Sequence, residues 1–309
     1  MVSLVYKADP VRGAEWARLF AEKAPQINFY LWPETGPADQ VRYMAAWEPP
    51  ANLQQNFPHL EIFFALGAGV DHIDFSLIPA HVPIVRMLDP GIVNGMLEYL
   101  SLAVLGIHRQ WSHYAQQQRD SQWQTLRVLP AASRRIGVLG MGMLGKATLL
   151  KLTEFGFPCA GWSRSPQQIL HVDCFSGTAA LPAFLARSDI LICLLPLTKD
   201  TRGILNLELF SLLPTGAVII NVGRGAHCVQ DDLLAALECG QISQAVRDVC
   251  DPEPLPKEHW LWSHPRVTLT PHIASMTQPQ SAVTVVLDNI SRHVQGLAMH
   301  GLVGRERGY

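Results

Sequence analysis

The chain has 309 residues and a formal net charge of −2, with apolar side chains at 48% of its positions and charged ones at 16%. This length and balance predict a compact globular protein with enough residues for two cores, and they exclude a disordered chain. A charge so close to zero also argues against a basic surface for nucleic acid.

The first hundred residues alternate strand-like and helix-like patterns. Asp9 followed by Pro10 predicts the start of a helix, and helical spacing continues over Val11–Ala24. Apolar runs separated by Pro, Gly and Asn predict strands at Val2–Tyr6, Ile27–Leu31, Val41–Trp47, Ile62–Leu66 and Val82–Leu88. Alternation of this kind predicts a parallel sheet with helices on both faces.

One long helix is predicted over Val93–Arg119, and a second alternating series begins at Arg135. The strands of that series are predicted at Ile136–Leu139, Pro158–Trp162, Ile190–Leu195, Ala217–Asn221, Ala245–Val249 and Val267–Leu269. The last amphipathic stretch, Pro279–Gln295, is expected to return to the first domain. The sequence therefore predicts two doubly wound α/β lobes, the first discontinuous in sequence, with a cleft between them.

The strand at Ile136–Leu139 runs into glycines at Gly140, Gly142 and Gly145, and helical spacing resumes after them. This combination is a dinucleotide-binding fingerprint. The first glycine makes the turn, the second lets backbone approach the pyrophosphate, and the third lets helix pack on strand. We expect these glycines to contact a dinucleotide. Two further residues of the loop are expected to join them: Met143 and Leu144.

The end of the next strand indicates which dinucleotide binds. An NAD site has an acidic residue there, but this chain has Ser163, Arg164 and Ser165. A carboxylate would repel a 2′-phosphate, whereas a hydroxyl and a guanidinium would bind it, so we expect NADPH to be preferred over NADH. The alternative is a solvated loop arginine without a partner. Pro196 and Thr198, which follow a later strand, are expected to lie along the cofactor.

Three polar residues, Arg224, Glu253 and His272, follow three successive strands of the second lobe. Each has an ordinary explanation by itself: an arginine between glycines can fill a turn, a glutamate between prolines can cap a helix, and a lone histidine is usually structural. Together they supply a cation for the carboxylate and carbonyl of a 2-keto acid, a proton donor for the new alcohol, and a group that orients the donor.

These motifs together resemble those of the D-2-hydroxyacid dehydrogenase family. They are Gly-x-Gly-x-x-Gly at 140–145, Asn-x-x-Arg-Gly at 221–225, Asp-Val-x-x-x-Glu-Pro at 248–254 and Pro-His-Ile-Ala at 271–274. The resemblance covers nearly the whole chain. It implies two Rossmann-like or flavodoxin-like lobes: residues 1–98, completed by 276–309, would bind substrate, and residues 99–275 would bind the dinucleotide.

The resemblance also implies a role for each site residue. Arg224 would bind substrate, His272 would be the acid/base that contacts substrate, and Glu253 would be its partner. The loop Gly67–Asp71 is similar to the family's substrate loop, whose backbone N–H groups hold the carboxylate. Further cofactor contacts are implied for Val222, Gly223 and Asp248, and further substrate contacts for Trp47, Ala68 and Gly69.

Within the family, the chain is most similar to members that reduce glyoxylate and hydroxypyruvate. The similarity lies in Trp162–Ser165, Glu253–Pro256 and the C-terminal Arg307–Tyr309. It implies NADPH-dependent reduction of these substrates to glycolate and D-glycerate. Two alternatives stay open: the same chemistry on another small 2-keto acid, and a non-catalytic nucleotide-sensing protein of the same fold. The departures from the family pattern are Arg247, at a usually apolar position, and Cys250, at a usually aromatic one.

The sequence also suggests where and how the protein acts. The N-terminus lacks a signal pattern, no apolar run is expected to reach the length of a membrane span, and six cysteines without zinc-like spacing indicate reduced thiols and no metal. We expect a cytoplasmic protein without a membrane partner.

We also expect a homodimer through the predicted long helix, although its apolar side chains could instead fill a core. They are Leu97, Leu100, Leu102, Val104, Leu105 and Ile107.

Overall fold

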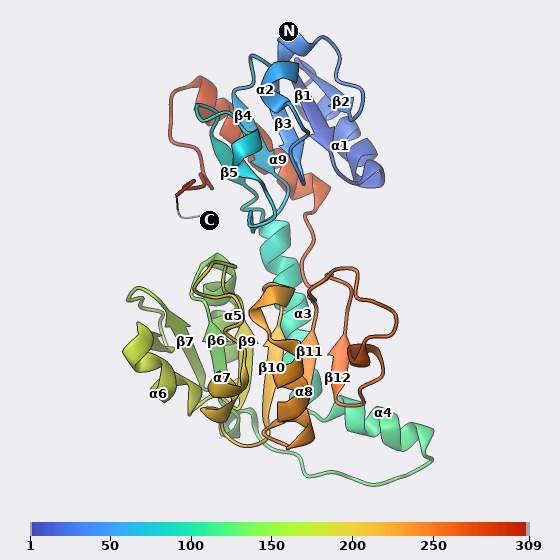
Figure 1. Ribbon diagram of the computed structural model, residues 1–309, viewed down its shortest axis with the longest axis vertical. Coiled ribbons are helices and arrows are strands. Elements are labelled where there is room, and N and C mark those ends of the chain that lie inside the picture. Colours follow the sequence, from blue (N-terminus) through green and yellow to red (C-terminus); the bar gives the residue numbers. More distant parts are fainter. Residues whose placement is uncertain (1, 307–309) are drawn as a thin grey trace. The chain divides into compact units, whose positions relative to one another are not determined.

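The structure is a computed structural model that describes residues 2–306, and these form two compact units (Figure 1). The chain passes from the first unit to the second between Ile92 and Val93 and returns between Ser275 and Met276. The first unit is therefore discontinuous in sequence and the second continuous. The C-terminal Arg307–Tyr309, which supported the family resemblance, lies outside the described residues.

The first unit is built on a parallel sheet with the strand order β2-β1-β3-β4-β5. This is the flavodoxin-like order of a doubly wound sheet. The strands are β1 (Val2–Lys7), β2 (Ile27–Leu31), β3 (Val41–Ala46), β4 (Ile62–Ala65) and β5 (Ile84–Arg86). The C-terminal segment continues this sheet at its β5 edge, where Leu302 pairs antiparallel with Val85.

Helices cover the first sheet because their apolar faces meet its buried strands. The predicted helix start is confirmed: the Asp9 side chain accepts a hydrogen bond from the N–H of Arg12, and Pro10 is the first helical residue. Trp16 of that helix packs on Tyr6 of β1, with ring centroids 5.2 Å apart. The helices of this unit are α1 (Pro10–Lys23), α2 (Leu53–Asn56) and α9 (Pro279–Val294).

The second unit has a parallel sheet with the order β12-β11-β10-β9-β6-β7-β8, which contains the order of a dinucleotide-binding fold. Its strands are β6 (Ile136–Leu139), β7 (Cys159–Ser163), β8 (Asp173–Ser176), β9 (Ile190–Cys193), β10 (Ala217–Asn221), β11 (Ile242–Arg247) and β12 (Val267–Leu269). The strand β8 was not predicted from the sequence. Its four residues lie at the sheet edge and none is buried, so they lack the apolar pattern of the inner strands.

Alternate residues of the second sheet enter two different cores, as the period of a strand requires. In β9, Leu191 and Cys193 belong to one core, and Ile190 and Ile192 to the other. The first core is completed by α6 (Leu181–Leu185), α7 (Leu207–Ser211) and α8 (Gln230–Glu238), and the second by α3 (Pro90–His108) and α5 (Met143–Glu154).

The expected single helix over Val93–Arg119 is wrong. It is two helices, α3 and α4 (Trp111–Arg119), because Gln110 adopts a left-handed conformation with φ 56°.

The structure also corrects the expectation about membrane spans, since α3 is long and apolar enough, by length and composition alone, to cross a membrane. One face of α3 packs within the protein, since Leu100 and Val104 are fully buried in a core of the second unit.

Candidate active site

The glycine loop after β6 leaves space beside the start of a helix. A side-chain carbon at Gly145 would lie 1.8 Å from the carbonyl oxygen of Gly140, so only glycine lets α5 begin this close to the loop. At Gly142 the same carbon would meet nothing within 4 Å. The helix starts at Met143, and no side chain caps its first N–H groups. Open space next to uncapped helical N–H groups fits a pyrophosphate.

The end of β7 places the predicted phosphate-binding residues at the surface. Ser163 is the last residue of that strand, and its hydroxyl donates to the carbonyl of Ser165 at 2.7 Å. Arg164 between them is exposed. Farther along the sheet, the N–H of Thr198 donates to the Thr201 hydroxyl at 2.8 Å, and that hydroxyl donates to the carbonyl of Pro196 at 2.7 Å. These hydrogen bonds fix the shape of both loops.

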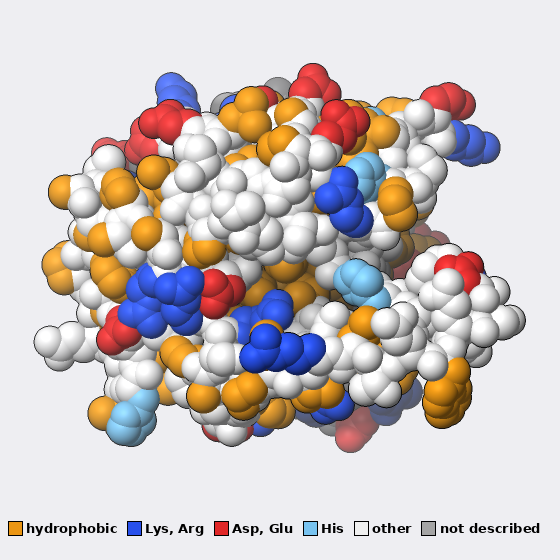
Figure 2. All heavy atoms as spheres, turned by 90° about the horizontal axis from the view of Figure 1, so that it is seen from below, with side chains coloured by type: hydrophobic (Ala, Val, Ile, Leu, Met, Phe, Trp, Pro, Cys, Tyr) orange, Lys and Arg blue, Asp and Glu red, His pale blue; other side chains and the backbone are white. Residues whose placement is uncertain are grey.

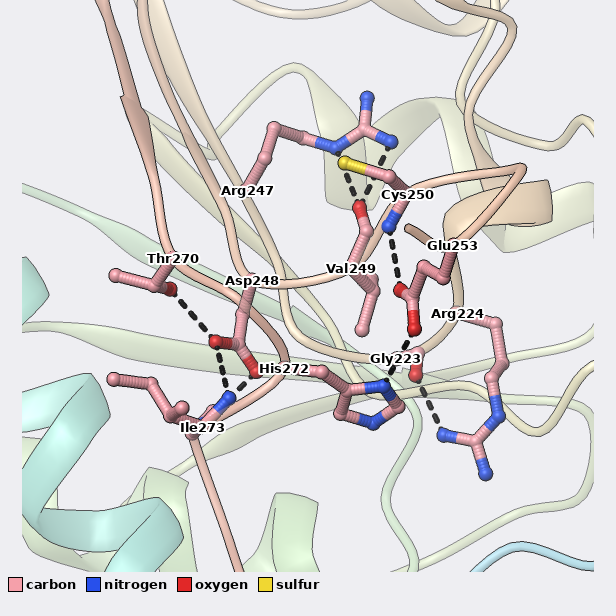
Figure 3. A network of polar contacts seen from close by, with 11 residues as sticks. Gly223, Arg224, Arg247, Asp248, Val249, Cys250, Glu253, Thr270, His272 and Ile273 are labelled. Carbon is pink, nitrogen blue, oxygen red and sulfur yellow. Dashed lines mark hydrogen bonds and ion pairs between the residues drawn. The ribbon is translucent and has the colours of Figure 1, made fainter. Parts of the chain in front are cut away.

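Arg224 lies in a loop whose shape is set by two fully buried polar side chains. The Asn221 side chain accepts from the N–H of Gly223 at 3.2 Å and donates to the carbonyl of Arg224 at 2.9 Å. The ring of His227 accepts from the N–H of Arg224 at 3.0 Å. Val222 is buried beneath this turn. The guanidinium of Arg224 donates from Nη1 to the carbonyl of Gly223 at 2.8 Å, as Figure 3 shows.

Glu253 and His272 form a hydrogen-bonded pair, with Nδ1 of the ring 2.9 Å from Oε2 of the carboxylate (Figure 3). Burial pushes the pKa of Glu253 upward, but the hydrogen bonds from His272 and Cys250 and the charges of His272 and Arg224 outweigh it and hold that pKa below its ordinary value. An ionised carboxylate can only accept, so Nδ1 of His272 carries the hydrogen. Its Nε2 is then the atom left for proton exchange.

Asp248 holds the backbone on which His272 is carried. His272 has φ 55°, a left-handed conformation that side chains other than glycine seldom adopt. The Asp248 carboxylate accepts from the N–H of Ile273 at 2.8 Å and of Ala274 at 2.9 Å, and from the hydroxyl of Thr270 at 2.7 Å. The backbone carbonyl of Asp248 accepts the N–H of His272 at 2.8 Å. The side-chain carboxylate and the backbone carbonyl of Asp248 therefore both fix the position of His272.

The sequence analysis did not single out several residues that support this site. His227 orders the Arg224 loop, and Thr270 joins Asp248 to the hydroxyl of Tyr99, 2.6 Å away on α3. A sequence signal existed only for Thr270, which directly precedes the Pro-His motif. A contact from α3 could not be inferred without the fold.

The predicted substrate residues of the first unit cluster after β3 and β4. Trp47 stacks on His72, with ring centroids 4.0 Å apart, and its ring borders Gly67. Ala68 and Gly69 are half-buried, and among residues 2–306 no hydrogen bond uses their N–H groups as donors. Donors of this kind beside an aromatic ring can bind a small anion.

Three comparisons with known proteins agree on one family. The model of the D-isomer specific 2-hydroxyacid dehydrogenase NAD binding domain matches residues 101–274. A glyoxylate/hydroxypyruvate reductase A from Yersinia enterocolitica is 44% identical over 303 residues, 96% of each chain.

Solved structures resemble the chain over its whole length. A D-isomer specific 2-hydroxyacid dehydrogenase from Xanthobacter autotrophicus Py2, in complex with NADPH and MES, has a TM-score of 0.95 and 37% identity, covering 100% of this chain and 99% of that one. An NADPH-dependent glyoxylate/hydroxypyruvate reductase from Sinorhizobium meliloti, in complex with NADP and sulfate, has a TM-score of 0.92 and 33% identity, covering 100% of both chains. The sheet orders and the glycine loop described above are those expected of such a fold.

Proposed function

The chain belongs to the D-isomer specific 2-hydroxyacid dehydrogenase family, and from this premise we propose that it reduces glyoxylate and hydroxypyruvate with NADPH, giving glycolate and D-glycerate. The observation that carries the proposal is the pair of His272 and Glu253, 2.9 Å apart, with the charge of Arg224 acting on the same carboxylate. A protein that only senses a nucleotide has no need of an oriented proton donor.

Substrate binding is assigned to donors that suit a small 2-keto acid. Arg224 offers a charged guanidinium for the carboxylate and the carbonyl oxygen, since bonds between charged groups are the strongest of the hydrogen bonds. The N–H groups of Ala68 and Gly69 are proposed to hold the same carboxylate, and Trp47 to bound the space next to them. These contacts select for size and charge, and both named substrates are small and anionic.

Proton transfer is assigned to Nε2 of His272. In the reductive direction the ring must start protonated, because the carbonyl oxygen gains a proton as its carbon is reduced. Glu253 stabilises the charged ring and keeps Nδ1 occupied, so that only Nε2 can donate. The reverse oxidation uses the neutral ring as a base. Because reduction consumes one proton, its equilibrium moves toward oxidation as the pH rises.

The residues present fit a nicotinamide dinucleotide. The open space at Gly142 and the start of α5 suit the pyrophosphate, and Val222, Gly223 and Asp248 are proposed to line the nicotinamide end. When bound, the cofactor supplies the hydride. Ser163, Arg164 and Ser165 are proposed to bind the 2′-phosphate, because no carboxylate ends β7.

The proposal is tested by following NADPH oxidation, through the absorbance of the reduced nicotinamide, against a panel of 2-keto acids. We expect glyoxylate and hydroxypyruvate to be reduced with the highest kcat/KM. A different best substrate would establish the same chemistry on another acid. No turnover with any acid, in a protein that binds NADPH, would favour the nucleotide-sensing alternative.

We also propose that the protein is a homodimer. Part of the predicted dimer surface is not available: Leu100, Val104 and Ile107 are buried in the core of the second unit. The exposed apolar side chains lie farther along the chain, on α4 and the loop that runs back beneath the unit in Figure 1, and Figure 2 shows apolar side chains among charged ones at this end. They are Trp111, Trp123 and Val128, and Leu102 of α3 is exposed as well.

A second copy of the chain is the proposed partner for this segment. No residue of α4 is buried, Trp111 is 72% exposed, and Trp123 has its whole surface open to solvent. Exposed tryptophans are the side chains that contribute most to interfaces when covered. Sedimentation should give a mass near twice 34.2 kDa. A mass of 34.2 kDa at micromolar concentrations would reject the dimer.

We propose a cytoplasmic location as well. All six cysteines are free thiols, including the exposed Cys239, and free thiols are typical of a reducing compartment. Fractionation of cells that express the protein tests this, and recovery in an extracytoplasmic fraction would contradict it.

A further inference from the structure

Arg247 ends β11, and the proposed reaction gives its charge no role. The side chain is fully buried. Its Nε and Nη2 donate to the carbonyl of Val249 at 3.3 and 3.1 Å, while Nη1 makes no hydrogen bond. Within residues 2–306 no carboxylate forms an ion pair with this guanidinium. Burying a cation without an anion is unfavourable, so packing alone does not account for this residue.

The contact with Val249 fixes a whole peptide group. The carbonyl of Val249 and the N–H of Cys250 belong to one planar trans peptide, so they point in opposite directions. The N–H of Cys250 donates to Oε1 of Glu253 at 2.7 Å. Two donors on a rigid guanidinium orient the carbonyl, and they thereby aim the N–H at the carboxylate. They also polarise the peptide, which makes that N–H a stronger donor.

Glu253 links this peptide to the ring of His272, because its other oxygen contacts Nδ1 of that ring (Figure 3). The contacts that run from Arg247 through the Val249–Cys250 peptide and Glu253 to His272 are called the connection below. We propose that Arg247 is a positioning residue: it orients the Val249–Cys250 peptide, which in turn holds Glu253 in place against His272. The proposal rests on the proposed function insofar as His272 transfers the proton. The contacts themselves do not depend on which acid is reduced.

The charged and titratable groups around the connection leave the guanidinium without a compensating anion. Glu253 is faced by Arg224 and His272, from the loops after β10 and β12. Burial raises the pKa of the thiols that face the guanidinium, so these stay neutral at neutral pH; they are Cys193, Cys228 and Cys250. Three carboxylates act on those thiols: Asp232 on Cys228, and Glu253 and Asp248 on Cys250. The oxygens of Asp248 are already engaged by the loop that carries His272.

The departure at Arg247 therefore has a structural explanation, whereas only the backbone of Cys250 takes part. A guanidinium reaches the carbonyl of Val249, which an apolar side chain at that position could not hold. Without it the peptide is free to rotate, the N–H of Cys250 leaves the carboxylate, and the pKa of Glu253 rises. His272 then loses part of the contact that orients it.

The test follows the titration of Glu253 by NMR of protein carrying 13C-labelled glutamate side chains, with the signal identified by its loss in Glu253→Gln. In Arg247→Met we expect Glu253 to titrate at higher pH than in the parent. Arg247→Lys keeps the charge and a single donor nitrogen in place of the two-pronged guanidinium, and should shift the titration less. Cys228→Ala changes a neighbour of the guanidinium outside the connection and should leave it unchanged. An identical Glu253 titration in the parent and Arg247→Met would overturn the proposal.

Kinetics give a second readout. Arg247→Met should lower kcat by about 3- to 10-fold, the value of one hydrogen bond, with little change in KM because Arg224 is untouched. If Arg247 acts through Glu253, adding Arg247→Met to Glu253→Gln should cost nothing further. Multiplicative losses would overturn the proposal. If Arg247→Met does not fold, as thermal unfolding would show, Arg247→Gln replaces it, being neutral with an amide donor.

The titration needs neither substrate nor cofactor, which separates the two proposals. A protein that reduces no 2-keto acid but shows the Glu253 shift would refute the proposed function and leave the positioning role intact. A protein that reduces glyoxylate but shows no shift would do the reverse.

Discussion

The loops after β10, β11 and β12 and the segment from Arg109 to Pro130 belong to the same unit but obtain their contacts differently. In the loops, buried side chains such as Asn221 and Asp248 satisfy the backbone of the chain itself. In the segment, Trp111 and Trp123 are exposed and no residue of α4 is fully buried. The loops are therefore held by contacts within their own unit, whereas the segment leaves large apolar side chains exposed, and we have proposed that a second copy of the chain covers them.

The largest effect should come from His272→Ala, which removes the proton donor from a loop held by its backbone. We expect kcat to fall by about 10² to 10⁴. NADPH affinity and the mass in sedimentation should stay at the parental values, because neither depends on the imidazole. Glyoxylate reduction at close to the parental rate would remove His272 from the mechanism.

A second variant alters the exposed segment and leaves the loops after β10, β11 and β12 unchanged. Replacing both Trp111 and Trp123 by Ser should weaken dimerisation by about 10²-fold or more, because each buried aromatic side chain is worth roughly 1.5–3 kcal/mol. Sedimentation equilibrium measures the dissociation constant. The kcat should remain near the parental value. A dimer of unchanged strength would place the interface elsewhere, and loss of activity on dissociation would show that the site is not complete in one chain.

Arg164→Ala tests the surface-exposed part of the site at the end of β7. The loss of a charge-assisted bidentate contact should reduce the preference for NADPH over NADH by roughly 10- to 100-fold. The measurement is kcat/KM with both cofactors in the parent and the variant. Equal use of NADH by the parent would refute the cofactor assignment, and an unchanged ratio in the variant would assign the phosphate to other residues.

The pKa of Glu253 predicts a loss of activity and stability in acid. Because that pKa is below the ordinary value of about 4.3, the stability from its ionised form is fully present above that pH and lost as the pH falls through the lower folded value. The kcat/KM for reduction should decline over the same range, as His272 loses its anionic partner. Profiles of Tm and kcat/KM against pH should lose this acid limb in Glu253→Gln. An identical limb in that variant would assign it to another group.

The smallest effect is expected from Thr270→Val, which removes a hydroxyl and keeps the shape of the side chain. Losing its bond to Asp248 should lower kcat by about 3- to 10-fold. Thr270→Ser keeps the hydroxyl and serves as the matched control. A Val variant that equals the Ser variant in kcat would show that the Asp248 carboxylate holds the His272 loop through the backbone alone.

The inner strands and the glycine loop were predictable because burial leaves a repeating apolar pattern and the Gly140–Gly145 spacing has a geometric cause. Other features had no such local signal. The break at Gln110 uses a left-handed residue where neither Gly nor Pro marks it. β8 is an edge strand of four residues, none of them buried, so it lacks the apolar run of the inner strands.

The residues of the candidate site also divide into those with a local sequence signal and those without one. Residues that we propose do the chemistry, such as His272, follow strands in short motifs and could be found from the sequence. The residues that position them make contacts with residues far away in the sequence or with backbone groups. The bond from Tyr99 to Thr270 joins positions 171 residues apart, and Arg247 acts through a peptide group whose orientation only the fold defines. Sequence reasoning marked Arg247 as a departure but could not assign it a contact.

The most direct test of the central claim is to identify the product made from hydroxypyruvate. Purified protein, NADPH and hydroxypyruvate are incubated, NADPH consumption is recorded by absorbance, and glycerate is resolved by chiral chromatography. We expect D-glycerate in an amount equal to the NADPH consumed, and about 10²-fold less or lower with His272→Ala over the same period. L-glycerate, or NADPH consumption without glycerate, would contradict it.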